Sequence, residues 1–122
     1  MISGMMASRD ALVARVRAAL RRTPRVREQR MFGGITFMVN GKMCISVGAR
    51  GLMCRIDPAS HEAAIARRGV RTVRMRGRAY RGFVRVRPDV VTSKHALDYW
   101  VRACLAFNRH AKSSKRRRAA HR

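Results

Sequence analysis

The strongest structural signal in the chain is the segment 30–47, RMFGGITFMVNGKMCISV. It predicts two strands joined by Asn40-Gly41, because both positions of a two-residue type I′ turn require positive φ and the flanking residues favour β-structure. This turn sets a register in which Val39 lies opposite Lys42. Neither face of the hairpin is polar, so we expect it to be a central part of a sheet, with helices over one face.

The same register assigns the other hairpin residues to two faces. The predicted partners are Phe37 with Cys44 and Ile35 with Ser46 on one face, and Met38 with Met43 and Thr36 with Ile45 on the other. Since the Ile35 and Phe37 side of the hairpin suits a helix layer, Met38 and Met43 either fill the core or form an adaptable contact surface. We predict a homodimer whose interface includes Met38 and Met43.

Two adjacent glycines, Gly33 and Gly34, interrupt the strand-like sequence. They predict a bulge or a close approach of another backbone or side chain. Phosphate binding is the weaker interpretation, because no strand-to-helix transition and no Gly-x-Gly-x-x-Gly pattern follow.

The charge of the chain is its main compositional feature. Its 122 residues, enough for one domain, contain 29 Lys and Arg but only 6 Asp and Glu, giving a formal net charge of +23. The hydrophobic fraction of 47% excludes a wholly disordered chain. Such an excess favours polyanionic partners, nucleic acid or an anionic lipid surface, unless arginine merely replaces other surface residues.

The cysteines Cys44, Cys54 and Cys104 are odd in number and lie in apolar stretches, as buried reduced cysteines of a cytoplasmic protein do. Cys44 would be reactive only if a neighbouring arginine lowered its pKa, and an inert buried thiol is the preferred interpretation. The chain begins without a signal-peptide pattern, and no run approaches the ~20 apolar residues of a membrane span. We therefore expect a cytoplasmic protein that makes no membrane contact.

The rest of the chain predicts alternating helices and strands. We expect a helix over 8–22 with Ser8 as N-cap, a strand over 52–56, a helix over 58–68, strands over 72–77 and 80–87, and a helix from 92 or 93 to about 109. Asp57 caps the second helix, Pro58 starts it, and Gly69 ends it in the left-handed conformation. Trp100 is the expected core anchor of the last helix.

This order predicts a two-layer α+β domain, α-β(3)-α-β(2)-α, with helices on one face of an antiparallel sheet. Residues 1–7 are expected to be a flexible N-terminus, residues 8–109 the domain, and residues 110–122 a basic disordered tail without large apolar side chains.

The second hairpin is the predicted nucleic-acid site. With a turn at Arg78-Ala79, Arg76 lies opposite Arg81, and Val73, Met75, Val84 and Val86 point inward. The outward face then holds Arg74, Arg76, Arg81, Phe83, Arg85 and Arg87. An aromatic side chain among cations suits single strands or unstacked bases, whereas a charged edge that resists aggregation is the alternative. The tail arginines Arg116, Arg117 and Arg118 would add affinity without specificity.

These segments resemble the TfoX/Sxy N-terminal domain family. The resemblance is carried by RMFGG at 30–34 with ITF at 35–37, NGKM at 40–43, LMCRID at 52–57, MRGR at 75–78, RGFVRV at 81–86, and residues 97–101, and it covers about residues 11–109. It implies the α-β(3)-α-β(2)-α order and a fold similar to type III secretion chaperones, which commonly form dimers. It also implies competence regulation, since longer members act at promoters with the cyclic-AMP receptor protein. We expect this short chain to lack the second domain of those regulators.

Groups suited to catalysis are sparse. His61 with Glu62 falls in the first turn of a short helix, and His95 with Asp98 is an ordinary i, i+3 helix pair. The sequence has neither a nucleophile elbow nor metal-ligand spacing, so we expect no enzymatic activity, no cofactor and no metal. Our hypothesis is a regulatory protein that contacts nucleic acid through arginine; the alternative is a homodimeric protein-interaction adaptor with no nucleic-acid role.

Overall fold

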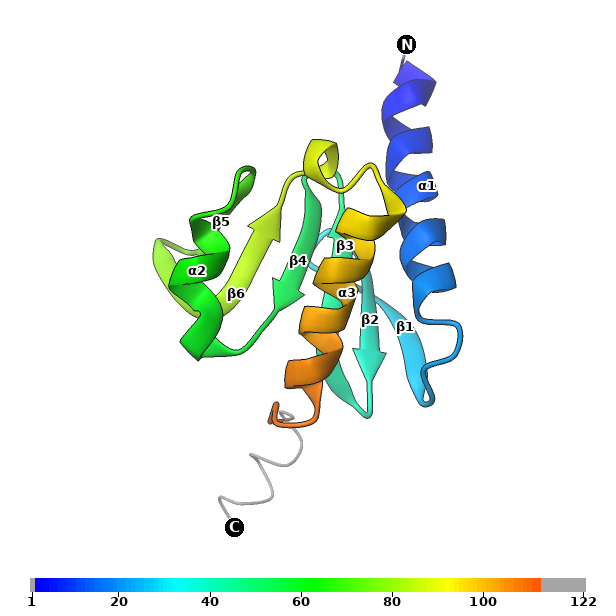
Figure 1. Ribbon diagram of the computed structural model, residues 1–122. Coiled ribbons are helices and arrows are strands. Elements are labelled where there is room, and N and C mark those ends of the chain that lie inside the picture. The colour runs from blue at the N-terminus through cyan, green and yellow to red at the C-terminus, as the bar shows by residue number, and fades with distance from the viewer. Residues whose placement is uncertain (1, 113–122) are drawn as a thin grey trace.

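The computed structural model describes residues 2–112, with side chains from residue 9 onward. The helices are α1 (Ile2–Ala19), α2 (His61–Ile65) and α3 (Lys94–Asn108), and the strands are β1 (Val26–Met31), β2 (Gly34–Val39), β3 (Lys42–Gly48), β4 (Gly51–Arg55), β5 (Val70–Met75) and β6 (Arg78–Val86) (Figure 1). Short 3-10 turns, η1 (Pro58–Ser60) and η2 (Pro88–Val90), precede α2 and α3. The predicted α+β class is confirmed.

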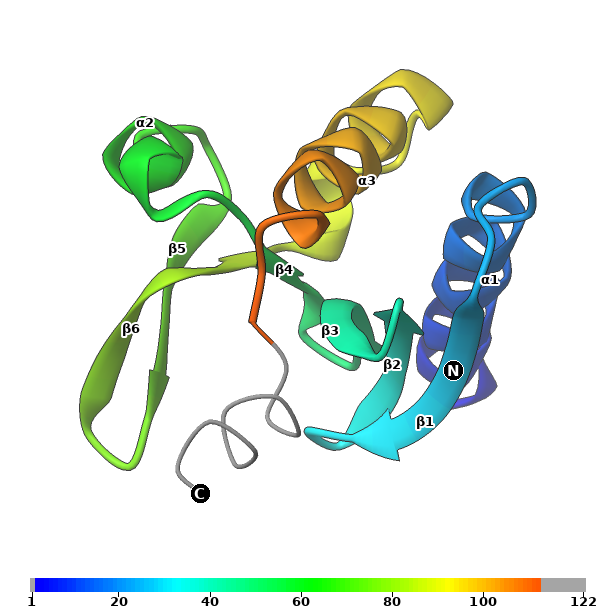
Figure 2. The same cartoon turned by 90° about the horizontal axis from the view of Figure 1, so that it is seen from below.

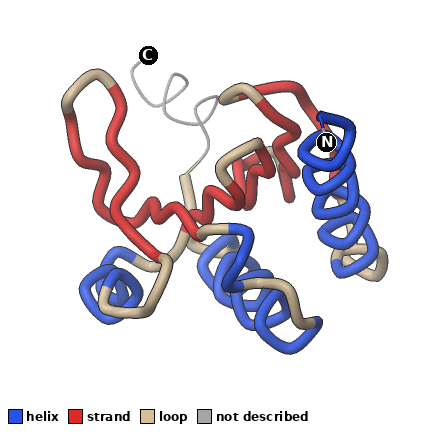
Figure 3. Tube along the Cα trace, turned by 90° about the horizontal axis from the view of Figure 1, so that it is seen from above, coloured by secondary structure: helices blue, strands red, loops and turns tan. Residues whose placement is uncertain are grey.

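The strands form one antiparallel sheet in the order β1-β2-β3-β4-β6-β5. The helices α2 and α3 lie on one side of it, and α1 lies beside its β1–β2 end, packed against β3 and α3 (Figure 2). The outer β1–β2 and β5–β6 hairpins bend toward the opposite side of the sheet (Figure 3).

The structure contains a strand that the sequence analysis did not predict. β1, with the sequence VREQRM, is an edge strand whose four central residues are all exposed, so it lacks the apolar alternation that would have revealed it. Phe32 (φ 54°) and Gly33 (φ 73°) form the tight turn into β2. Four strands therefore precede α2, not three. The helix α1 also differs, since it begins at Ile2 rather than at Ser8 and ends at Ala19.

The Asn40-Gly41 turn is confirmed, with φ of 54° and 73°, and Val39 lies opposite Lys42 as predicted. Beyond the Met38–Met43 pair a bulge shifts the register. The pairs are then Phe37 with Ile45, Thr36 with Ser46 and Ile35 with Val47, so the predicted pairing past Met43 is wrong by one residue. The bulge leaves Cys44 unpaired and lets both Cys44 and Ile45 pack in the core under the helices.

The second hairpin also has a different register from the predicted one. Its turn is Arg76-Gly77, with φ of 53° and 76°, and not Arg78-Ala79. Near the turn Val73 lies opposite Tyr80, but past an irregularity at Thr72/Val73 the pairs are Thr72 with Val84, Arg71 with Arg85 and Val70 with Val86. The predicted inward set is therefore split, because Val84 and Val86 face the helices while Val73 and Met75 pack on the opposite side of the sheet.

The predicted start of the short helix is confirmed, but its predicted end is not. Asp57 Oδ1 accepts a hydrogen bond from the Ala59 N–H at 2.9 Å, and Pro58 occupies the first position of the 3-10 turn that leads into α2. Gly69 has the predicted left-handed conformation, with φ 78°, but α2 already ends at Ile65, so Gly69 does not end the helix as predicted. Trp100 is only 4% exposed and lies in the main core, as predicted.

The main core lies between the sheet and the helices. Its largest fully buried side chains include Val16 from α1, Phe37 and Ile45 from the central hairpin, and Leu52 and Val86 from the next strands. These side chains hold the strands in fixed register, which also fixes what the other side of the sheet presents.

Candidate nucleic-acid interface

The side of the sheet that faces away from α2 and α3, which we call the second face, carries a row of side chains crossing five strands. Directly paired residues of antiparallel strands point to the same side. From β2 to β5 the row contains Thr36, Ser46, Met53, Arg85 and Arg71. Thr36 Oγ1 donates to Ser46 Oγ at 2.9 Å, and both residues are buried. The row therefore begins with two hydroxyl groups that are hydrogen-bonded to each other and ends with two arginines.

An apolar group, which we call the methionine cluster, lies beside this row. It consists of buried Met43, Met53 and Val73, with half-buried Met38, Met75 and Phe83 packed against them. Both residues predicted for a dimer interface belong to it. Met43 is only 8% exposed within the single chain, so Met38 is the member of the pair whose side chain is accessible to a partner. The dimer stays a prediction.

Three arginines, which we call the arginine cluster, meet at one end of the second face. They are Arg50 in the β3–β4 turn, Arg71 in β5 and Arg85 in β6, and with Arg87 they line a cavity of about 440 Å³. Partial burial lowers the pKa of Arg85, and the positive charges of Arg50 and Arg71 lower it further. The Arg85 guanidinium is therefore close enough to Arg50 and to Arg71 to be repelled by both.

The carboxylates of the protein all interact with groups outside the arginine cluster. All six lie within the described residues: Asp10, Glu28, Glu62, Asp89 and Asp98 pair with cations, and Asp57 caps η1. No salt bridge to any of these carboxylates reaches Arg50, Arg71 or Arg85 within residues 9–112. The arginine cluster is therefore a site of uncompensated positive charge.

Two members of the predicted patch are neutralised. Arg81 Nη2 donates to Glu62 Oε1 at 2.7 Å, and Arg87 donates to both carboxylate oxygens of Asp89 at 2.8 and 2.9 Å. These hydrogen bonds lower the pKa of Glu62 and of Asp89. They use the planar fork of each guanidinium, so Arg81 and Arg87 have less capacity for an outside anion.

The remaining predicted residues are dispersed. Arg74 donates to the Gly77 carbonyl at 3.3 Å across the hairpin turn, and Arg76 forms that turn. Phe83 lies on the second face near Arg85, as the prediction required, but the Arg55 guanidinium already covers its ring at 5.4 Å from the centroid. The predicted outward face is therefore not one continuous surface. Arg116, Arg117 and Arg118 lie outside the described residues.

The arginine cluster includes Arg50 and Arg71, which sequence reasoning missed. Arg71 comes opposite Arg85 only because the β5–β6 pairing is irregular between Thr72 and Val73, where Gly82 on the other strand adopts φ 89°. Strand alternation carries no signal for such an irregularity. Arg50 lies in a turn, and only the sheet order, which places β4 next to β6, brings it near Arg85.

The thiols do not form a reactive centre. Cys44, Cys54 and Cys104 are free and buried, as predicted. The hydrogen bond with Cys104 and burial both raise the pKa of Cys44, and burial raises that of Cys104, so both thiols stay protonated. Among residues 9–112 we find no group of three His, Cys, Asp or Glu side chains positioned to hold a metal ion.

The fold and this surface define a small, arginine-rich α+β protein with a basic sheet face. A comparison with protein-family models matches the TfoX N-terminal domain over residues 6–108, and the chain therefore belongs to that family. No curated protein and no solved structure matched the chain. None of the described helices is long and apolar enough to cross a membrane.

Proposed function

We propose that this chain is a non-enzymatic, TfoX-like regulatory protein that binds nucleic acid through the arginine cluster. The observation that supports this function is the convergence of Arg50, Arg71 and Arg85 without a carboxylate partner among the described residues. Holding like charges together costs free energy, and a bound phosphate backbone would remove that cost.

The geometry favours contact with phosphates over reading of bases. Phe83, the aromatic residue of the predicted patch, is already covered by Arg55 and packed edge-on against Tyr80, with 6.4 Å between the ring centroids. A ring held in this way is less available for base stacking. We therefore expect weak sequence preference and a strong dependence of affinity on salt concentration.

Fluorescence anisotropy with labelled single-stranded and duplex DNA, measured over a salt series, tests the proposal. The double variant Arg71→Gln, Arg85→Gln should bind DNA at least about tenfold more weakly than wild type. The slope of log K against log salt should also become shallower, since each phosphate that the protein neutralises on duplex DNA adds about 0.9 to its magnitude.

The matched control is Arg17→Gln, Arg81→Gln, which removes the same formal charge from two arginines that carboxylates already neutralise and that do not line the cavity of the arginine cluster. It should change the affinity by less than about threefold, because screened exposed ion pairs contribute little to distant binding. Equal losses of affinity in both double variants would show that only net charge matters and would reject the site. Truncation after residue 111 measures the separate contribution that we predict for Arg116, Arg117 and Arg118.

The competing function is a homodimeric adaptor that contacts protein through the methionine cluster. Met38, Met75 and Phe83 are half-buried and pack against the buried members of the cluster, so a second copy could cover their exposed parts. Met38→Glu should then convert a dimer to a monomer in light scattering at micromolar concentration, because an unpaired buried carboxylate is costly. Ala49→Glu, at an exposed turn, is the control with the same charge change. A wild type that is already monomeric would contradict the dimer.

A further inference from the structure

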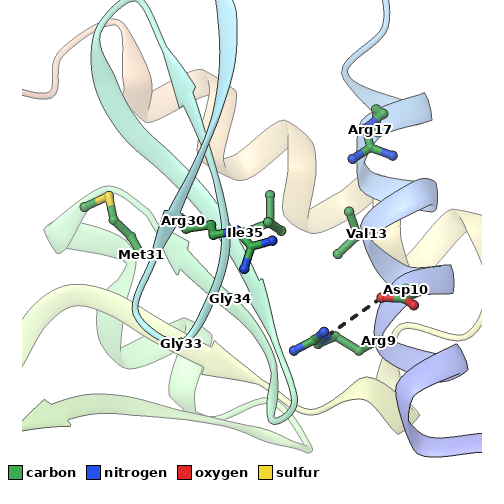
Figure 4. Close-up of a pocket in the computed structure, with 9 residues that line it drawn as sticks. All are labelled: Arg9, Asp10, Val13, Arg17, Arg30, Met31, Gly33, Gly34 and Ile35. Carbon is green, nitrogen blue, oxygen red and sulfur yellow. Dashed lines mark ion pairs between the residues drawn. The ribbon is translucent and has the colours of Figure 1, made fainter. Parts of the chain in front are cut away.

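A second cationic site lies between α1 and the β1–β2 hairpin. A cavity of about 690 Å³ opens there, with one wall from α1 and the other from the hairpin (Figure 4). Its volume is within the range of pockets that bind small organic molecules. None of the three residues of the arginine cluster lines it.

Three arginines line this cavity, but only one of them is fully engaged. Arg17 donates to both oxygens of Glu28 at 2.6 and 2.7 Å, which ties α1 to β1. Arg9 Nε forms an ion pair with Asp10 Oδ1 at 3.9 Å, a distance too long for a hydrogen bond, and Asp10 also lines the cavity. For Arg30 we find no hydrogen bond and no ion pair with any other described residue. Arg9 and Arg30 therefore keep donors available for a ligand.

These two guanidinium groups approach the same space from opposite walls. Figure 4 shows Arg30 extending from the hairpin toward α1, and Arg9 extending from α1 toward the hairpin. Arg30 pairs with Ile35 across the β1–β2 ladder, so its side chain is on the α1 side of the sheet. Arg27, three residues earlier in β1, lies on the other side and does not line the cavity.

The remainder of the cavity includes apolar surface. Val13 is 7% exposed and Ile35 is half-buried, and both line the cavity as well as the main core. A ligand that fits must therefore combine an oxyanion, which a guanidinium fork binds in bidentate fashion, with an apolar body. Two forks from opposite walls match a tetrahedral phosphate, whose oxygens point in several directions, better than a planar carboxylate.

We propose that this cavity binds a small organic phosphate, a phosphomonoester on an apolar or aromatic body. Arg9 and Arg30 bind the phosphate, and Val13 and Ile35 contact the body. The binding site does not depend on the nucleic-acid function proposed above.

Isothermal titration calorimetry with phenyl phosphate in buffer of physiological ionic strength tests the proposal. We expect saturable binding of one ligand per chain to the wild-type protein. Arg30→Gln should weaken this binding about tenfold or more, because glutamine cannot supply the charge-assisted hydrogen bonds of the guanidinium. Arg27→Gln removes the same charge from the other side of the same strand, and it should change the affinity less than about twofold.

Further ligands distinguish the source of the oxyanion. Inorganic phosphate should bind more weakly than phenyl phosphate because it lacks the apolar body, and benzoate should bind more weakly because it lacks the tetrahedral head group. Benzoate that binds as tightly as phenyl phosphate would overturn the phosphate assignment. Displacement of phenyl phosphate by single-stranded DNA from the Arg71→Gln, Arg85→Gln variant would overturn the small-molecule assignment in favour of a nucleic-acid backbone.

Amide chemical shifts locate the binding independently of any variant. Phenyl phosphate should move the signals of Val13, Gly33 and Gly34, which surround the cavity, and leave those of Arg71 and Arg85 in place. Equal weakening by Arg30→Gln and Arg27→Gln, the absence of saturable binding, or shifts confined to the arginine cluster would each reject the site.

Discussion

At the scale of single residues, the neighbouring glycines Gly33 and Gly34 have different roles. Gly33 has φ 73° in a turn, and a Cβ there would meet no atom within 4 Å. Gly34 lies in β2, where a Cβ would be 2.0 Å from the Val47 carbonyl oxygen of the neighbouring strand. The sequence predicted a close approach of this kind, but it did not reveal which glycine made the approach and which formed the turn.

We expect alanine at these two positions to have unequal effects. Gly33→Ala should lower the free energy of unfolding by about 1–2 kcal/mol, the cost of a left-handed conformation with a Cβ. Gly34→Ala should cost roughly 3 kcal/mol or prevent folding, since backbone rather than a flexible side chain must move. Urea denaturation of both variants measures the difference, and similar values would contradict the geometry.

His61 is a buried histidine whose tautomer follows from its contacts. Its Nδ1 accepts a hydrogen bond from the Gly82 N–H at 2.9 Å, so the proton lies on Nε2, which donates to Thr72 Oγ1 at 2.8 Å. The side chain is 4% exposed and ties α2 to both strands of the β5–β6 hairpin. The sequence had suggested no more than a residue in the first turn of a short helix.

Removal of the His61 side chain should destabilise the protein. His61→Ala leaves the buried Gly82 N–H without its partner, which costs about 1–3 kcal/mol in the free energy of unfolding. His95→Ala, at an exposed position of α3, is the control and should have an effect within about 0.5 kcal/mol. Chemical denaturation of both variants checks this, and equal stabilities would contradict a structural role for His61.

At the scale of elements, the tight turns show how far sequence reasoning could reach. Asn40-Gly41 is a strong type I′ signal, and its turn was predicted correctly. Arg76-Gly77 adopts similar positive φ values, but arginine rarely adopts positive φ, so the sequence did not indicate a turn there. The start of the short helix was predictable because Asp57 and Pro58 act through local contacts, whereas Ser8, predicted as the N-cap of the first helix, lies inside α1. The β-bulges were not predictable, because their positions depend on which side chains fit under the helices.

Replacement of Arg76 by asparagine should therefore stabilise the second hairpin. Asparagine tolerates the left-handed region that Arg76 occupies at φ 53°, and we expect a gain of roughly 0.5–1 kcal/mol in the free energy of unfolding. Arg78→Asn removes the same charge from a strand position and controls for reduced repulsion. Thermal melting compares them, and an equal gain in both variants would assign the effect to charge alone.

At the scale of the whole molecule, the dominant feature is charge that the protein cannot compensate internally. The formal net charge is +23, and each of the six carboxylates already has a partner or a cap. The net charge was evident from the sequence. The positions of the unpaired cations were not evident from the sequence, because they depend on which cations lie near a carboxylate in the folded chain.

The melting temperature should rise with sodium chloride at neutral pH. Salt screens the repulsion among the unpaired cations, and this gain should exceed the loss from screening a few exposed ion pairs. Scanning calorimetry between low and physiological salt measures the change. A melting temperature that falls with salt would show that the ion pairs dominate.

Stability should also fall in acid. Partner cations lower the pKa of Glu28, Glu62, Asp89 and Asp98 below the ordinary values of 4.5 and 3.8. A carboxylate with a lowered pKa in the folded state stabilises the fold above its ordinary pKa, and this contribution disappears as the pH falls through the folded value. These carboxylates should therefore leave the melting temperature level between neutral pH and about pH 5 and lower it from there towards about pH 3. A profile that stays flat down to about pH 3 would contradict this prediction.

The order of the strands has a consequence for how fast the protein folds. Each neighbouring pair in the sheet is joined by a tight turn, except β4 and β6, which are separated in the chain by η1, α2 and β5. Local hairpins close with little loss of chain entropy, whereas a pairing that spans a longer loop is slower. The β4–β6 ladder should thus form late, and mutations there should accelerate unfolding more than they slow folding.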